Sequence, residues 1–153
     1  MKISSPSIIT GTGIDRNQIR ALMPHAGHMC LLDRVLTWDR DTIVCQADSN
    51  VHDNPLRRRG RIGAACGIEY AAQAMALHGA LNAAGTRQRA GVLASVRDTN
   101  CYVAALAEGT LNIEARLLLC EGIRVIYGFT VSGSDKMLLE GRAAVVLGPS
   151  SAD

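Results

Sequence analysis

Residues 62–84 form one stretch of strongly helix-favouring sequence, IGAACGIEYAAQAMALHGALNAA. Apolar residues fall on every side of the helix that this stretch predicts, a pattern typical of a helix buried all round. Glu69 is its only formally charged residue at neutral pH. Because an ionised carboxylate is costly to bury, an enclosed Glu69 needs a functional reason, and general acid catalysis is one. The alternative interpretation places Glu69 on a solvent-facing strip with Gln73 one turn later.

The length and composition favour one globular domain, residues 1–153, with residues 1–13 and 149–153 loosely ordered. With 48% hydrophobic residues the chain can bury a sizeable core. A formal net charge of +2 and 3% aromatic residues argue against a nucleic-acid-binding protein. The polar residues and glycines within 62–84 disfavour membrane insertion, and no signal peptide is visible, so we expect a cytoplasmic protein.

Five cysteines are spaced widely along the chain: Cys30, Cys45, Cys66, Cys101 and Cys120. No CxxC pair is present, and we expect these residues to be reduced and to belong to the core. His25 and His28 have the spacing of metal ligands, but apart from Asp33 they lack a Cys or an acidic partner nearby. The sequence therefore predicts no metal site.

The order of the predicted elements indicates an α+β domain. Asp15 caps a short helix that ends at Met23, and two strand-like segments then form a hairpin across residues 39–41. A polar, basic loop over residues 49–61 leads into the long helix, which ends at Gly85, and four strand-like segments follow. We therefore predict a curved antiparallel sheet of about six strands wrapped around one long central helix.

Two motifs resemble those of a known family. The segment MPHAGHMCLLDRV, residues 23–35, is similar to the opening of the hot-dog-fold 3-hydroxyacyl-acyl-carrier-protein dehydratases of fatty-acid synthesis. GIEYAAQAMALHGAL, residues 67–81, is similar to their central-helix signature, in which a Glu is followed four residues later by a Gln. The resemblance is closer still to the predicted dehydratases of aryl-polyene and related pigment biosynthesis. It implies the hot-dog fold and the removal of water from a 3-hydroxyacyl thioester to give a trans-2-enoyl thioester.

The resemblance also implies catalytic residues. The family's helix carboxylate corresponds to Glu69, which would protonate the departing hydroxyl. The family's histidine corresponds best to His52 in VHDNP, seventeen residues before Glu69, and would take the proton from the carbon next to the thioester. His25 would line the substrate site, and Gln73 would orient the Glu69 carboxylate.

The start of the long helix offers two further expected contacts with a substrate. Backbone amides of the first turn, at Ala64 and Ala65, lie at the positive end of the helix dipole and would stabilise the thioester oxygen. Four arginines crowd the loop before this turn: Arg57, Arg58, Arg59 and Arg61. We expect them to dock an acidic acyl-carrier protein, whose phosphopantetheine arm carries the substrate, so that no separate cofactor is needed. A solvated charged loop with no partner is the alternative.

The resemblance implies a homodimer, because hot-dog domains commonly join two sheets into one and share active-site residues between subunits. A related dehydratase subunit is a further expected partner. Two other functions fit the same residues. One is a hot-dog acyl-thioester hydrolase, in which the helix carboxylate activates water. The other is a non-catalytic acyl-binding subunit.

Overall fold

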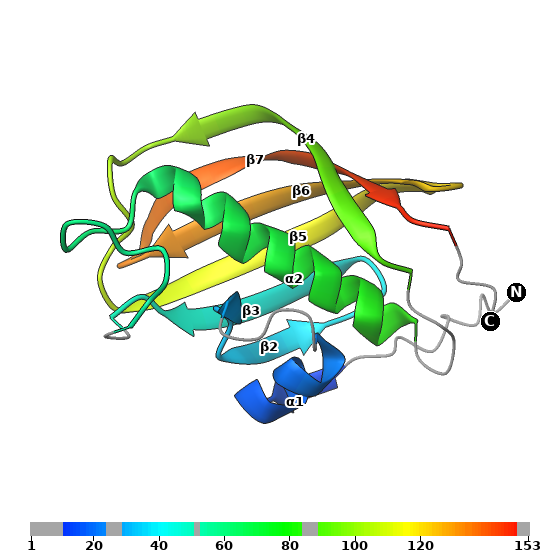
Figure 1. The fold of residues 1–153 in the computed structure, drawn as a ribbon, viewed down its shortest axis with the longest axis horizontal. Coiled ribbons are helices and arrows are strands. Elements are labelled where there is room, and N and C mark those ends of the chain that lie inside the picture. The colour runs from blue at the N-terminus through cyan, green and yellow to red at the C-terminus, as the bar shows by residue number, and fades with distance from the viewer. Residues whose placement is uncertain (1–10, 24–28, 51–52, 84–88, 150–153) are drawn as a thin grey trace, which may run out of the picture.

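One antiparallel sheet of seven strands curves around one long helix, α2, in the part of the chain that the computed structural model describes, residues 11–23, 29–50, 53–83 and 89–149 (Figure 1). The strand order is β1-β2-β3-β5-β6-β7-β4. The strands are β1 (Gly11–Ile14), β2 (Arg34–Trp38), β3 (Thr42–Asp48), β4 (Gly91–Cys101), β5 (Thr110–Glu121), β6 (Arg124–Gly133) and β7 (Lys136–Leu147). The helices are α1 (Arg16–Leu22), α2 (Gly67–Asn82) and a 3-10 turn (Ala64–Cys66) that leads into α2. This is the predicted hot-dog arrangement.

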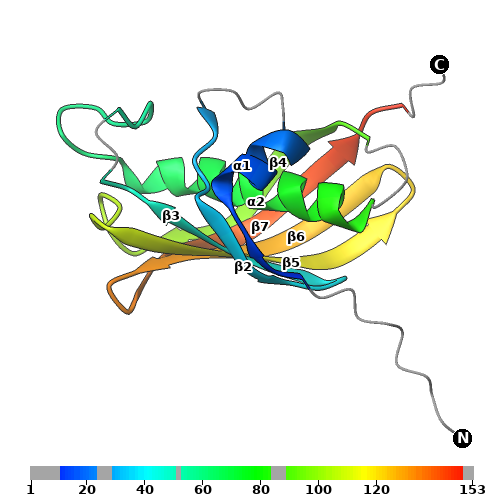
Figure 2. The same cartoon turned by 90° about the horizontal axis from the view of Figure 1, so that it is seen from below.

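The short helix α1 begins where the sequence predicts. The Asp15 carboxylate accepts a hydrogen bond from the Gln18 amide at 2.9 Å, and the Gln18 side chain accepts one from the Asp15 amide, also at 2.9 Å. This capping box satisfies two amides that the first turn would otherwise leave unpaired. Arg16 then pairs with Asp33 at 2.6 Å, so Asp33 ties α1 to the segment before β2. Figure 2 shows α1 and α2 on the same side of the sheet.

The β2–β3 hairpin turns where the sequence predicts, and a second tight turn joins β6 to β7. The β2–β3 turn spans residues 39–41, where the Asp39 carboxylate accepts hydrogen bonds from the amides of Asp41 and Thr42 at 2.8 Å each. The β6–β7 turn places Ser134 and Asp135 at positive φ, as two-residue hairpin loops require. Strands β5, β6 and β7 pair in sequence as an antiparallel meander.

The core lies between the concave side of the sheet and one face of α2. Tyr70, Ala71, Ala74 and Leu77 on that face are each 0% exposed, and they pack against the inward side chains of the sheet. The first residue of the helix is Gly67. A Cβ at this position would overlap the Leu139 side chain, so glycine lets the helix start this close to the sheet. The small residues thus bring the helix close to the sheet.

Several expectations need correction. The sheet has one strand more than predicted, because residues 11–13, part of the stretch 1–13 expected to be loose, pair with β2 together with Ile14. Helix α2 is not covered on all sides by the described residues: Ala76 is exposed, and Ala72 and Gly79 are only partly buried. Two of the cysteines expected in the core, Cys101 and Cys120, are exposed at strand ends, while all five are free thiols.

None of the described helices is long and apolar enough to cross a membrane.

Candidate active site

Glu69 lies in the first turn of α2, on the uncovered face of the helix. Its side chain is partly buried, so the expectation of a fully enclosed carboxylate is wrong for the described chain. Ala72, Ala76 and Gly79 continue the same face, because residues three, seven and ten positions further along a helix lie on one side of it. We call this strip, residues 69, 72, 76 and 79, the open face of α2. A carboxylate there can reach a bound molecule and remains partly shielded from water.

Gln73 connects the open face to the first sequence motif. Its side-chain oxygen accepts a hydrogen bond from the Leu31 amide at 2.8 Å, and its nitrogen donates to the Met29 carbonyl. The same nitrogen lies 3.4 Å from Glu69 Oε1, a long contact that holds the carboxylate loosely. Gln73 is itself buried, and it therefore anchors the chain after the PHAGH segment beside Glu69. His25 lies outside the described residues.

Asn54 makes a second connection to α2, at Tyr70. Its amide nitrogen donates to the Tyr70 hydroxyl at 2.9 Å, and its oxygen accepts from the Leu56 amide at 2.9 Å. Asn54 is 9% exposed, so the bond to Tyr70 is shielded from water. The described end of the VHDNP motif, from residue 53 on, is thereby anchored to the side chain of Tyr70. His52, two residues before Asn54, lies outside the described residues, and its distance from Glu69 is left as a prediction.

The turn that leads into α2 is held by the segment before β5. Ala64 donates its amide to the Ala104 carbonyl at 3.0 Å, and Leu106 donates to the Ile62 carbonyl at 2.8 Å. The amide of Ala64 is therefore already paired, which speaks against the oxyanion role expected for it. Ala65 is exposed one residue further along, beside the start of the helix.

The four arginines of the loop divide into two pairs. Arg57 donates to the carbonyls of Ser49 and Gly60, and Arg58 donates to the carbonyls of Pro55 and Arg57, so these two side chains brace the loop. Arg59 and Arg61 are exposed and have no ion pair among the described residues. All four side chains keep their positive charge, because carbonyls do not neutralise a guanidinium, and the second pair is exposed and is not used to brace the loop.

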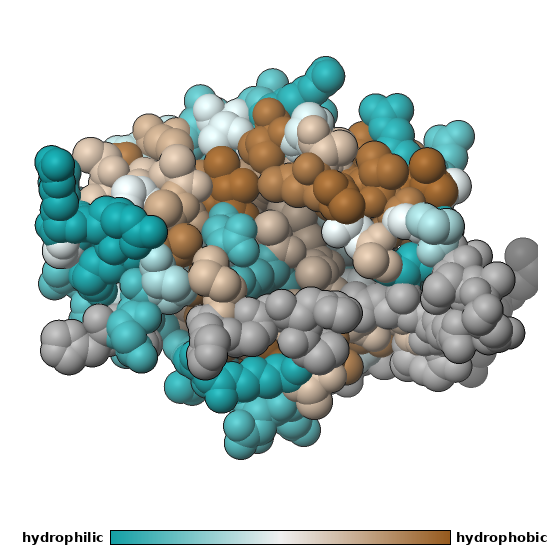
Figure 3. All heavy atoms as spheres, in the orientation of Figure 1, coloured by the Kyte–Doolittle hydropathy of each residue, from teal (hydrophilic) through white to brown (hydrophobic). Residues whose placement is uncertain are grey.

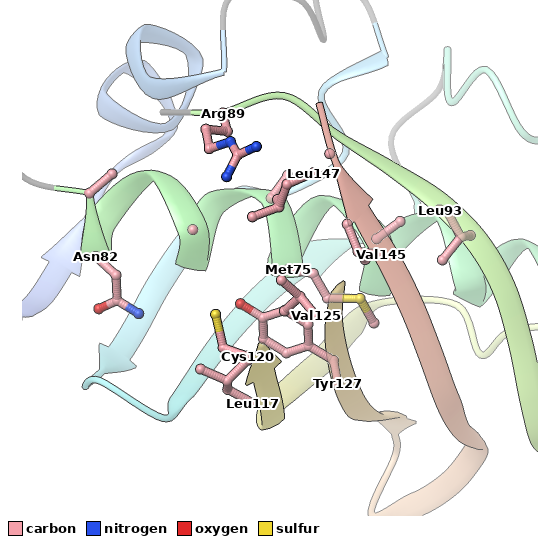
Figure 4. A pocket seen from close by; sticks show the side chains of 15 residues that line it. Met75, Asn82, Arg89, Leu93, Leu117, Cys120, Val125, Tyr127, Val145 and Leu147 are labelled. Carbon is pink, nitrogen blue, oxygen red and sulfur yellow. The ribbon is translucent and has the colours of Figure 1, made fainter. Parts of the chain in front are cut away.

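An apolar cavity of about 370 Å³ opens one turn beyond Glu69 along the open face (Figure 4). It lies between α2 and the ends of four strands. Figure 3 shows apolar side chains gathered on this side of the molecule. The cavity is lined by Ala72, Met75, Ala76, Gly79, Asn82, Ala83, Arg89, Gly91, Leu93, Leu117, Cys120, Val125, Tyr127, Val145 and Leu147. A volume and lining of this kind suit an alkyl or aryl chain.

His78 belongs to the covered side of α2 and is 0% exposed. Its Nδ1 lies 2.8 Å from the Tyr127 hydroxyl, and its Nε2 lies 2.8 Å from the Asp39 carbonyl oxygen. Burial lowers the pKa of His78, and burial raises the pKa of Tyr127. Neither residue belongs to a motif that predicts a site at the cavity, although a histidine within a mostly apolar helix is a visible signal. In the described residues no cluster of His, Cys, Asp or Glu side chains is suited to hold a metal ion.

Solved structures share this architecture at low sequence identity. The dehydratase heterocomplex ApeI:P from Xenorhabdus doucetiae matches with a TM-score of 0.78 and 22% identity, over 86% of this chain and 91% of that one. The PaaI protein of the E. coli phenylacetic acid degradation operon matches with a TM-score of 0.61 and 14% identity, over 84% and 95% of the two chains. Thioesterase HI1161 from Haemophilus influenzae matches with a TM-score of 0.60 and 12% identity, over 81% and 82%. At these identities the likeness shows the fold alone.

No curated protein matches the sequence. The profile of the ApeP-like family, described as ApeP dehydratase, matches residues 17–152. The match spans both motifs, the VHDNP loop and every strand from β2 to β7. The chain therefore belongs to the ApeP-like family of dehydratases.

Proposed function

We propose that this protein removes water from a 3-hydroxyacyl thioester carried on the phosphopantetheine arm of an acyl-carrier protein, giving a trans-2-enoyl thioester, in aryl-polyene or related biosynthesis. The observation that carries the proposal is the open face of α2. It carries one carboxylate, Glu69, one turn before an apolar cavity on the same side of the helix. A polar reacting group at Glu69 and an apolar chain in the cavity fit this layout.

In the proposed reaction Glu69 donates a proton to the 3-hydroxyl as the carbon–oxygen bond breaks, and water leaves. His52 removes a proton from the carbon next to the thioester. The electron pair of the broken carbon–hydrogen bond forms the new double bond. The bond between Asn54 and Tyr70 supports a fixed position for the end of this loop, because it anchors the loop to α2 two residues after His52 in the sequence. The exposed Ala65, rather than the paired Ala64, supplies the amide for the thioester oxygen.

The acyl-carrier protein docks at the arginine loop in this proposal. Carrier proteins are acidic, and Arg59 and Arg61 offer positive charge that no described residue neutralises. Arg57 and Arg58 hold the loop in shape through backbone carbonyls. Substituting Arg59 and Arg61 by Ala is therefore expected to raise KM for the carrier-bound substrate more than it changes kcat.

A second subunit completes the enzyme along β4. This strand is the last of the sheet, and Val92 and Leu93 on it are 67% and 39% exposed. An exposed edge of eleven residues is a ready site for pairing with another strand. We propose a homodimer joined here. A related dehydratase subunit is the alternative partner, supported by the heterocomplex of the structural neighbour ApeI:P.

The test is to incubate the purified protein with a 3-hydroxyacyl-carrier protein and to follow both the enoyl thioester and the free thiol. Dehydration gives the enoyl product with the thioester intact. Release of free thiol from a chain that lacks the 3-hydroxyl would instead support the hydrolase interpretation. If the protein binds the acyl-carrier protein but forms neither product, both alone and with a partner subunit, the result would support the non-catalytic subunit.

A mixing experiment tests the shared active site. Glu69→Gln and His52→Ala variants are inactive alone in this proposal. If each site takes Glu69 from one subunit and His52 from the other, a mixed dimer holds one intact site, and mixing restores part of the activity. Activity that stays absent in proven mixed dimers would place both residues within one subunit.

A further inference from the structure

We infer that the convex face of the sheet is an interface for a second copy of this chain, held by matched rows of arginines and carboxylates. Figure 2 shows α1 and α2 on the other side of the sheet, so neither described α-helix covers this face. The inference goes beyond the proposed reaction and does not depend on it. It is compatible with pairing along β4, because the edge and the face of a sheet are different surfaces.

A row of arginines crosses the convex face at one level. Arg116 on β5 and Arg142 on β7 both lie in register with Gly128, which stands between them on β6. Arg97 on β4 lies in register with Arg142. The residues on either side of Gly128 belong to the core, so the row points away from α2, and all three arginines are exposed. Because like charges directly opposite on neighbouring strands repel, the row is stable only with carboxylates close to it.

A row of acidic side chains runs beside the arginines, two residues away along each strand. Thr130 on β6 lies in register with Glu114 on β5 and with Glu140 on β7. Two residues span about 7 Å along a strand, so this is the separation of the two rows. Both rows carry their charges on β5 and β7 and an uncharged residue on β6. A hollow of about 520 Å³ lies over the two rows.

Within the described residues these charges are only partly paired. Arg116 lies 3.7 Å from Glu114, and the two side chains are 65% and 43% exposed. Glu140 accepts a hydrogen bond from the Tyr102 hydroxyl at 2.6 Å, and Arg142 forms no ion pair with a described residue. Exposed pairs contribute little to the stability of one chain, so these charges remain available to a partner.

The two rows are complementary to each other across a two-fold axis. An axis that runs between the rows, parallel to them, exchanges the rows and leaves each strand facing its own copy. Arg116 then faces Glu114 of the second copy, and Arg142 faces Glu140 of the second copy. The glycine of one row faces the threonine of the other, which leaves room for the larger side chain. Stacked sheets lie about 10 Å apart, a distance that an arginine and a glutamate can span together.

The balance of charge favours a second copy over a partner of one sign. The rows and the hollow together carry three arginines and three carboxylates, those of Asp98, Glu114 and Glu140. A polyanion that reached the arginines would also meet the carboxylates about 7 Å away, and a cationic partner would meet the reverse. Leu118, which is 47% exposed and lies beside Gly128, adds apolar surface that a second copy would cover.

Analytical ultracentrifugation of the full chain over a range of concentrations tests the interface. The wild type is compared with Arg142→Glu, with Glu140→Arg and with the double variant that carries both changes. Arg142→Glu places like charges at two symmetric contacts, so the dissociation constant should rise at least about tenfold. At concentrations where the wild type is assembled, the particle mass should therefore fall to about half. Arg20→Glu in α1, on the other side of the sheet, is the matched control and should keep the wild-type mass.

The double variant distinguishes this interface from a general effect of charge. Exchanging both charges restores opposite signs at each contact, so the double variant should regain the wild-type mass, and so should a 1:1 mixture of the two single variants. Equal masses for the wild type and Arg142→Glu at every concentration would overturn the inference. A double variant that keeps the mass of the single variants would also overturn it.

Arg142→Lys provides a second test if Arg142→Glu does not fold, because it keeps the positive charge. Chains that carry ¹⁴N and ¹⁵N are mixed and treated with a carbodiimide, which joins a lysine amine to a carboxylate in contact with it. The inference predicts cross-linked peptides that join the introduced lysine of one isotope to Glu140 of the other. Cross-links that form only between peptides of the same isotope, or none, would overturn it.

Discussion

The two sides of helix α2 differ in what they contact. The covered side, with Tyr70, Leu77 and His78, is sealed against the sheet and is 0% exposed. The open face begins with the partly buried Glu69 and continues into a cavity over Ala72, Ala76 and Gly79. One helix thus holds the fold with one side and offers a surface for chemistry with the other. Substitutions on the covered side are expected to lower stability, and those on the open face to lower activity.

Glu69→Gln is expected to have the largest effect. The amide retains the size of the side chain but cannot donate the proton, so the rate of dehydration should fall about 10²-fold to 10⁴-fold. Because the carboxylate is partly exposed and only loosely held by Gln73, the free energy of unfolding should change by less than about 0.5 kcal/mol. Turnover assays and urea unfolding measure the two quantities. Full activity in this variant would show that the carboxylate of the open face takes no part in the reaction.

Leu77→Ala tests the opposite side of the same helix. Its side chain is 0% exposed, so truncation leaves a cavity and should lower the free energy of unfolding by about 2–5 kcal/mol. The activity per folded molecule should stay close to that of the wild type. Leu118→Ala, at a side chain that is 47% exposed on β5, is the matched control and should cost far less. Equal losses of stability in the two variants would contradict the claim that the covered side of α2 stabilises the fold.

Ala76→Leu places a larger side chain in the cavity over the open face. Ala76 is exposed and lines the cavity, so the larger side chain should exclude long chains and spare short ones. We expect kcat/KM for long-chain substrates to fall about tenfold relative to short-chain substrates. The melting temperature should be unchanged. A uniform loss across chain lengths would mean that chains do not run along this face.

The pH dependence of stability should be the smallest effect, and it comes from the covered side. Burial lowers the pKa of His78 below its ordinary value near 6.5, so below that pH the unfolded chain binds the proton more readily than the folded one. The contribution of His78 to stability is therefore complete above pH 6.5 and is lost as the pH falls, by at most about 1.4 kcal/mol per pH unit. Urea unfolding from pH 7.5 to about 5 should show a shallower slope for His78→Gln than for the wild type.

Local signals allowed much of the fold to be predicted. The capping box of α1, the turns of the hairpins and the long apolar helix each follow from a few neighbouring residues. The pairing of β4 with β7 at the sheet edge joins segments about fifty residues apart, and no local pattern encodes it. The added strand β1 has the same cause, because four residues become a strand only by pairing with β2.

Part of the candidate site could likewise be predicted from local sequence, and part of it could not. The Glu69–Gln73 pair and the Asn54 loop lie within recognisable motifs, so their positions near the helix start could be expected. The exposure of one face of α2 could not be expected. A helix that is apolar all round predicts complete burial, whereas the described chain leaves one strip of it uncovered. The cavity also depends on the ends of β4 to β7, whose register is a long-range property.

A crystal structure with a 3-hydroxyacyl pantetheine analogue tests the central claim most directly. The account predicts that the 3-hydroxyl lies within about 3.2 Å of a Glu69 carboxylate oxygen, with the chain along Ala72 and Ala76 toward Tyr127. An analogue bound on another surface, or with its 3-hydroxyl far from every Glu69 of the assembly, would contradict it.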